Sequence, residues 1–177
     1  QYVCNLHEQA CAMAAEGYAR AACKMGVVCV TTGPGGTNAL TGLLGQWLDS
    51  IPVLYLSGQV RYDTTVASTS LPLRQLGDQE ANIIDIVRPI TKYAVMVTDP
   101  QLIRYNLEKA MHLAVSGRPG PVWLDIPLNV QSSMVEESNL KSYDPQEDLS
   151  AVAPDVDERH VDEVVERLSV SQRPVIL

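Results

Sequence analysis

The sequence predicts an α/β fold with three layers, in which a mainly parallel sheet is covered by helices on both faces. Helical and strand-like patterns alternate from residue 8 to about residue 126. Each strand-like run is apolar almost throughout, as is typical of strands buried on both faces of a parallel sheet. Because the strands alternate with helices, we expect right-handed crossovers between them.

Composition and spacing predict each element in turn. Residues 8–22 are rich in Ala, Met and Glu at helical spacing, and the β-branched run at 27–31 predicts a buried strand. A glycine-rich break at 33–36 precedes a helix over 37–48, for which Thr37 or Asn38 is a candidate N-cap. The later elements are a strand at 52–57, a long loop at 59–77, a short helix at 80–87, a strand at 93–97, a helix from Asp99-Pro100 to about Val115, a turn at 117–120 and a strand at 121–126.

The 177 residues suffice for one domain and part of another. Prolines, acidic residues and weak periodicity predict a linker after the last strand, and residues 132–168 hold 11 of the 21 acidic residues. We therefore expect a domain over 1–131, an acidic linker over 132–158 and the start of a second domain over 159–177. That second domain would begin with an amphipathic helix over 160–168 and a strand from Arg173.

Composition also excludes several classes of protein. The net charge of −8 argues against nucleic-acid binding, and no apolar run reaches the roughly 18 residues that span a bilayer. The four cysteines lie in the first 29 residues without a Cys-x-x-Cys pair, and the three histidines are scattered. We therefore expect neither disulfide nor metal site, and a cytoplasmic protein. The chain begins without Met or a signal-peptide pattern, so we expect it to be part of a longer protein.

One stretch with the composition of a ligand-binding loop runs from Gly33 to Asn38. It lies between a predicted strand and a predicted helix, where open α/β sheets bind ligands, and its glycines would let the backbone approach a ligand closely. It matches neither the dinucleotide fingerprint nor the P-loop, and the alternative to a ligand loop is a tight turn.

Three further candidates each have a plainer structural interpretation. Glu8 opens a helix, so it is either a partner of the helix dipole or a carboxylate that accepts a hydrogen bond from a ligand nitrogen. Residues 76–80 either line a cleft or cap the next helix. Arg118 either lies in a rigid turn or points to an anionic group.

Five motifs, in this order and at this spacing, resemble the thiamine-diphosphate-dependent enzyme family. The resemblance is to the N-terminal, pyrimidine-binding domain of acetolactate synthase and its relatives, without the first strand of that domain. It covers roughly residues 1–131, and its motifs are 7–9 with 15–20, 31–38, 49–53 with 57–60, 88–92 and 117–122.

The resemblance implies a catalytic role for Glu8. The equivalent glutamate of the family hydrogen-bonds N1′ of the aminopyrimidine and stabilises the imino tautomer, whose 4′-nitrogen removes the thiazolium C2 proton. The activated cofactor then attacks a 2-keto acid and acts as electron sink for decarboxylation. Pro34, Gly35 and Asn38 match the loop beside the pyrimidine, and Gln79 matches a glutamine near the reacting end of the cofactor.

The resemblance also implies cofactors and partners beyond this chain. Arg118 matches a position linked to FAD in acetolactate synthases. Mg²⁺ and the diphosphate are held in the family by a Gly-Asp-Gly motif followed by Asn, and no Gly-Asp-Gly occurs in this sequence. We therefore expect a homodimer or homotetramer with its active site between subunits, and an inactive chain when this part is alone.

Two departures from the family pattern concern the substrate region. Asp78 stands where acetolactate synthases usually have Phe, and Leu128 stands where they usually have Lys. Both departures favour a related 2-keto-acid decarboxylase as an alternative. The segment 61–75 is also longer than is usual in the family. An alternative of another class is a non-catalytic α/β assembly or regulatory module. A flavodoxin-like nucleotide-binding domain is disfavoured, because the phosphate fingerprints are absent.

Overall fold

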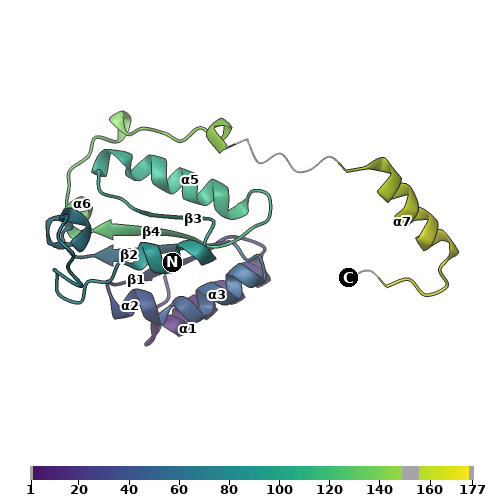
Figure 1. The fold of residues 1–177 in the computed structure, drawn as a ribbon, viewed down its shortest axis with the longest axis horizontal. Coiled ribbons are helices and arrows are strands. Elements are labelled where there is room, and N and C mark those ends of the chain that lie inside the picture. Colours follow the sequence, from purple (N-terminus) through teal and green to yellow (C-terminus); the bar gives the residue numbers. More distant parts are fainter. Residues whose placement is uncertain (1, 149–155, 176–177) are drawn as a thin grey trace. The chain divides into compact units, whose positions relative to one another are not determined.

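The computed structural model describes residues 2–148 and 156–175, and the chain divides into two compact units, Gln1–Pro145 and Gln146–Leu177. The first unit holds a parallel sheet in the order β1-β2-β4-β3, as Figure 1 shows. The strands are β1 (Gly26–Val30), β2 (Val53–Gln59), β3 (Tyr93–Met96) and β4 (Val122–Pro127). The helices of this unit are α1 (Glu8–Ala22), α2 (Pro34–Asn38), α3 (Leu40–Leu48), α4 (Ile83–Val87), α5 (Ile103–Val115) and α6 (Leu128–Gln131).

The sheet separates two hydrophobic cores, which confirms the predicted three layers. Successive residues of a strand point to opposite faces, so Tyr55 of β2 lies on one face and Leu54 on the other. Tyr55 stacks on Trp123 of β4 with ring centroids 4.6 Å apart, under helices α1 to α4. The opposite face packs Leu54 and Leu124 against Ala110 of α5 and against α6.

Most predicted elements of the first unit are confirmed, but three helices begin elsewhere, and one of these is α5, which begins at Ile103 after a 3₁₀ turn over Pro100–Leu102. α1 spans the predicted residues, with His7 as its N-cap. Neither Thr37 nor Asn38 is an N-cap: Gly33 takes that position with a φ of 58°, and Pro34 begins the helix at once. The helix expected from Glu80 starts at Ile83, because the Asn82 side chain caps it by accepting a hydrogen bond from Asp85 N.

The predicted linker is partly ordered on the first unit. Two 3₁₀ turns follow α6, namely Glu137–Asn139 and Pro145–Asp148. Tyr143 lies between them, is only 8% exposed, and donates its backbone N–H to Glu108 Oε2 of α5 at 2.9 Å. The compact unit therefore extends past residue 131, while the division at 131 and 158 stays a prediction, and residues 149–155 lie outside the described residues.

The second unit contains the amphipathic helix expected over 160–168. It is α7 (Glu158–Val170), and Asp157 caps it by accepting a hydrogen bond from Arg159 N. Residues 173–175 are not a strand, and the rest of the strand expected from Arg173 lies outside the described residues. In the described parts of both units, helices are too short or too polar to cross a membrane.

Candidate functional site

The candidate site lies at the carboxyl edge of the sheet, where the parallel strands all end. Glu8 begins α1 and Asn38 ends α2, which directly follows the loop after β1. The two side chains meet there, since Asn38 Nδ2 donates a hydrogen bond to Glu8 Oε2 at 3.0 Å. The structure thus brings together two of the residues that the sequence singled out.

The Glu8 carboxylate is held in its charged form. The hydrogen bond from Asn38 lowers the pKa of Glu8 below its ordinary value, and the residue's own backbone N–H and the nearby His7 lower it further. The position at a helix N-terminus acts in the same direction. The half-buried Glu8 is therefore an anion at neutral pH and can accept a further hydrogen bond.

Glycine at position 35 lets the loop backbone lie close to Thr31 and to this carboxylate. A Cβ at Gly35 would lie 2.7 Å from Thr31 Cγ2 and 3.7 Å from Glu8 Oε1. Any side chain there would therefore collide with Thr31 and fill the space next to Glu8. Pro34, the preceding residue, is exposed as the first residue of α2.

Gln79 reaches the same loop through its backbone. A Cβ at Gly33 would come within 2.0 Å of Gln79 O, so the two loops are in direct contact and only glycine fits. Gln79 itself has a φ of 54° and is exposed, as is Asp78. The structure therefore places Gln79 beside the Gly33–Asn38 loop.

Glu80 neither lines the site nor caps the next helix, the two alternatives for residues 76–80. Its Oε1 accepts from Val66 N at 2.6 Å, and its Oε2 accepts from Leu76 N and Gly77 N at 3.0 and 3.2 Å. Glu80 therefore fastens the long loop that precedes it.

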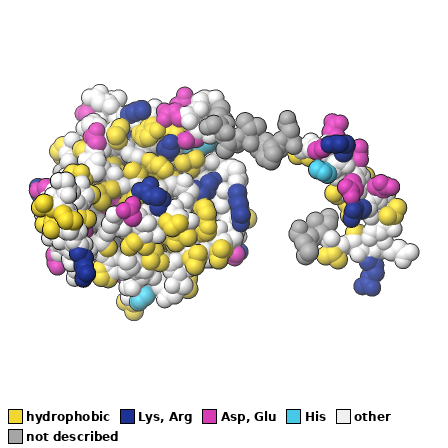
Figure 2. Space-filling view, in the orientation of Figure 1, with side chains coloured by type: hydrophobic (Ala, Val, Ile, Leu, Met, Phe, Trp, Pro, Cys, Tyr) yellow, Lys and Arg dark blue, Asp and Glu magenta, His cyan; other side chains and the backbone are white. Residues whose placement is uncertain are grey.

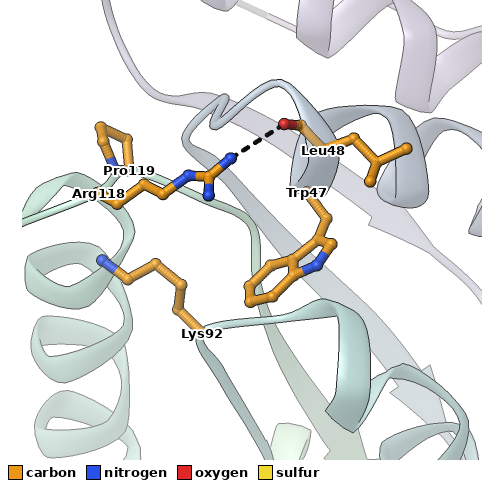
Figure 3. A pocket seen from close by; sticks show the side chains of 5 residues that line it. All are labelled: Trp47, Leu48, Lys92, Arg118 and Pro119. Carbon is orange, nitrogen blue, oxygen red and sulfur yellow. Dashed lines mark hydrogen bonds between the residues drawn. The ribbon is translucent and has the colours of Figure 1, made fainter.

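Arg118 lies at the other edge of the sheet, apart from Glu8. It precedes β4 at the amino ends of the strands, where its Nε donates to Ser50 Oγ at 2.7 Å and its Nη2 to Leu48 O at 3.3 Å. Figure 3 shows the guanidinium turned toward that carbonyl, above Lys92 and Trp47. Arg118 thereby lines a pocket at this amino edge of the sheet. The pocket has a volume of about 320 Å³, and its lining residues are Trp47, Leu48, Lys92, Arg118 and Pro119.

The sequence analysis missed a buried polar cluster beneath the site. Asp125 is fully buried and accepts hydrogen bonds from Ser57 Oγ at 2.5 Å and Gln59 Nε2 at 2.9 Å. Burial raises the pKa of Asp125 to about 6, although both hydrogen bonds act against this. A charged residue inside an otherwise apolar strand was the signal that could have revealed the cluster.

The described residues contain no group of three or more His, Cys, Asp or Glu side chains arranged to hold a metal ion. The carboxyl edge thus offers one ionised carboxylate, an amide that orients it, and glycine backbone close to that carboxylate.

Comparison with known proteins agrees with the fold. Residues 1–85 match the family described as thiamine pyrophosphate enzyme, N-terminal TPP binding domain. The acetolactate synthase large subunit of Lactococcus lactis subsp. lactis is 39% identical over 178 residues, which cover 100% of this chain and 29% of that protein. The chloroplastic acetolactate synthase of Arabidopsis thaliana is 35% identical over 96% of this chain and 24% of that protein. The Escherichia coli (strain K12) isozyme 3 large subunit is 42% identical over 78% of this chain and 24% of that protein.

The fold and the match support an N-terminal domain of the thiamine pyrophosphate enzyme family. Within this class the chain is acetolactate-synthase-like, because its similarity to acetolactate synthases extends over its whole length. It spans less than a third of the length of these relatives, at 29% and 24%.

Proposed function

We propose that this chain activates thiamine diphosphate in an enzyme that decarboxylates and ligates 2-keto acids, in the manner of an acetolactate synthase. The observation that carries the proposal is the ionised Glu8, oriented by Asn38 and lying close to the backbone of a glycine loop. Thiamine diphosphate supplies the electron sink for decarboxylation of a 2-keto acid. Glu8 would accept the hydrogen bond of the protonated pyrimidine nitrogen, and Gln79 would approach the reacting end.

The proposal includes groups that this chain does not hold by itself. Mg²⁺ and the diphosphate would be bound by a domain outside these 177 residues, so this part alone would be inactive. FAD would use the pocket at the amino edge, where Arg118 and Lys92 offer two cations beside the Trp47 ring. The compartment we propose is the cytoplasm, although some relatives are named as chloroplastic.

We also propose that the intact protein is a homodimer or homotetramer with the site between subunits. Figure 2 shows hydrophobic side chains over much of the visible face of the first unit. Among the exposed apolar residues are Met13 and Tyr18 of α1 and Leu44 of α3, on two helices that pack together. A second copy that covered such side chains would bury apolar surface and close the carboxyl edge from solvent.

A related 2-keto-acid decarboxylase is the second candidate function. Asp78 and Leu128 stand where acetolactate synthases usually have Phe and Lys, and both are exposed near the carboxyl ends of the strands. A screen of the intact protein against pyruvate and other 2-keto acids, with and without FAD, separates the two candidates.

Replacing Glu8 in the intact protein tests the proposed function. Glu8→Gln keeps an oxygen that can accept from Asn38 but removes the charge. A charge-assisted hydrogen bond is worth about 1.5–3 kcal/mol, so turnover of pyruvate dependent on thiamine diphosphate should fall by up to about 100-fold. The matched control is Glu158→Gln, which changes the first residue of another helix, α7, and should leave turnover unchanged.

Unchanged turnover in Glu8→Gln would contradict the role of Glu8. An intact protein that consumes no 2-keto acid at any concentration of thiamine diphosphate would instead favour the non-catalytic assembly module.

A further inference from the structure

The buried cluster under the site contains a junction, the side-chain amide of Gln59. Its Nε2 donates to Asp125 Oδ2 at 2.9 Å and to Ala81 O at 3.1 Å. Its Oε1 accepts from Thr32 Oγ1 at 2.6 Å and from Val60 N at 2.9 Å. One buried amide therefore links the central strands to two segments that are far apart in the sequence.

Both of these segments lead directly into the candidate site. Thr32 immediately precedes Gly33, whose loop carries Pro34, Gly35 and Asn38. Ala81 follows Gln79 by two residues, and the two loops touch where Gln79 O lies against Gly33. Gln59 thus holds both segments by hydrogen bonds close to the point where the two loops touch.

Asp125 anchors the junction from the neighbouring strand. The strands β2 and β4 pair in register, with Ser57 opposite Asp125 and Gln59 opposite Pro127. A second set of hydrogen bonds in the cluster joins only residues of β2 and β4. In this arm of the cluster, Ser57 Oγ donates to Asp125 Oδ1 and accepts from Trp123 Nε1 at 2.8 Å. Among the described residues, no buried side-chain nitrogen or oxygen lacks a hydrogen-bond partner, so each change removes a defined bond.

We propose that Gln59, anchored by Asp125, is a positioning residue that fixes the glycine loop and the Gln79 segment against each other for cofactor binding. The inference rests on the proposed function for its effect on the cofactor, while its effect on the loops is independent of that function. Gln59 acts through Thr32 and Ala81 and lies behind the loops that would meet the cofactor.

The test compares variants of the intact protein by amide hydrogen exchange and by the thiamine diphosphate concentration that gives half-maximal turnover. Gln59→Leu keeps much of the volume but removes both loop contacts. Exchange in residues 33–38 and 76–82 should become about tenfold faster, and half-saturation should need several-fold more cofactor. Thr32→Val is a milder variant, because it removes only the hydrogen bond between Thr32 and Gln59, and it can be tested even if Gln59→Leu does not fold. It should accelerate exchange only in residues 33–38.

Ser57→Ala is the matched control, because it removes a bond to the same carboxylate from the arm that stays within the sheet. It should lower the melting temperature and leave exchange in both loop segments and the cofactor dependence near wild type.

Two outcomes would overturn the role of Gln59: unchanged exchange in Gln59→Leu and Thr32→Val, or equal acceleration in Ser57→Ala. A wild-type protein without turnover dependent on thiamine diphosphate would overturn the proposed function instead, and the exchange rates would still decide the role of Gln59.

Discussion

Two carboxylates of the first unit have pKa values shifted in opposite directions by their surroundings. Glu8 lies at a half-buried helix N-terminus, where the Asn38 amide lowers its pKa. Asp125 is surrounded by the sheet, where loss of hydration outweighs two hydrogen bonds and raises its pKa to about 6. Glu8 is therefore a stable anion for recognition, while Asp125 gains or loses its charge within an accessible pH range.

The raised pKa of Asp125 gives folding a specific pH dependence. The folded protein binds this proton more tightly than the unfolded chain, whose ordinary value is 3.8. Protonated Asp125 therefore contributes to the free energy of unfolding. This contribution is fully present below about pH 4 and is lost as the pH rises through about 6. The two-unit shift sets an upper limit of about 3 kcal/mol on that loss.

Asp125→Asn should remove this dependence. Urea unfolding of both proteins from pH 4 to pH 8 gives the difference between their free energies of unfolding. As the pH rises, the variant should become more stable relative to the wild type. Taking the difference cancels the contributions of the other titrating groups. A difference that stays constant across this range would show that Asp125 titrates normally.

At the scale of single elements, local patterns predicted what depends on neighbours in the sequence. The helix over 8–22 was readable because its Ala and Glu content and its burial follow one period. The start of α2 was not, since the φ of 58° at Gly33 depends on contact with Gln79, 46 positions further on. The bond between Gln59 and Asp125 depends in the same way on how two strands pair.

In the candidate site, too, features set by local motifs were predicted, whereas features that depend on contacts between distant segments were not. Glu8, Gly35 and Asn38 were recognisable from their motifs, and the structure brings them together. The turn that holds Arg118 was predicted directly before a parallel strand, at the amino edge, but its contacts were not readable from the sequence, because they depend on where that turn meets the end of α3. The cluster around Asp125 was missed since its members come from segments far apart in the sequence, namely Thr32, the end of β2 and β4.

Two glycines should respond to alanine in opposite ways. Gly33 has a φ of 58° and a ψ of −117°, and a Cβ there would lie 2.0 Å from Gln79 O. Gly33→Ala should therefore cost about 1–3 kcal/mol of stability and weaken cofactor binding by separating the two loops. Gly17 lies inside α1, where a Cβ would have nothing within 4 Å.

The matched Gly17→Ala should stabilise the protein by about 0.5–1 kcal/mol, since alanine is the better helix former. Thermal unfolding of both variants checks the pair. Equal melting temperatures for Gly33→Ala and wild type would mean that the turn relaxes without strain.

For the whole molecule, the sheet has two edges with different chemistry. The carboxyl edge holds an anion beside glycine backbone, and the amino edge holds the cations of Arg118 and Lys92, where burial lowers the pKa of Lys92. Most of the acidic excess lies after residue 131, so the net charge of −8 describes the later segments better than either edge. The charge of the whole chain is therefore a poor guide to its ligands.

The extent of the first unit can be tested by truncation. Tyr143 packs edge-on against Tyr105 with ring centroids 5.6 Å apart, and Lys141 Nζ lies 4.4 Å from the centre of the Tyr105 ring. A chain ending at Pro145 keeps these contacts with α5, whereas a chain ending at Gln131 loses them.

Burial of a large apolar side chain is worth about 1.5–3 kcal/mol, so the shorter chain should be less stable than the longer one by about that amount. Urea unfolding followed by tryptophan fluorescence measures this, because Trp123 is fully buried in the core of the same unit. Tyr143→Ala in the longer chain should reproduce most of the loss. Equal stability of the two chains would place the end of the folded unit at residue 131, as the sequence alone predicts.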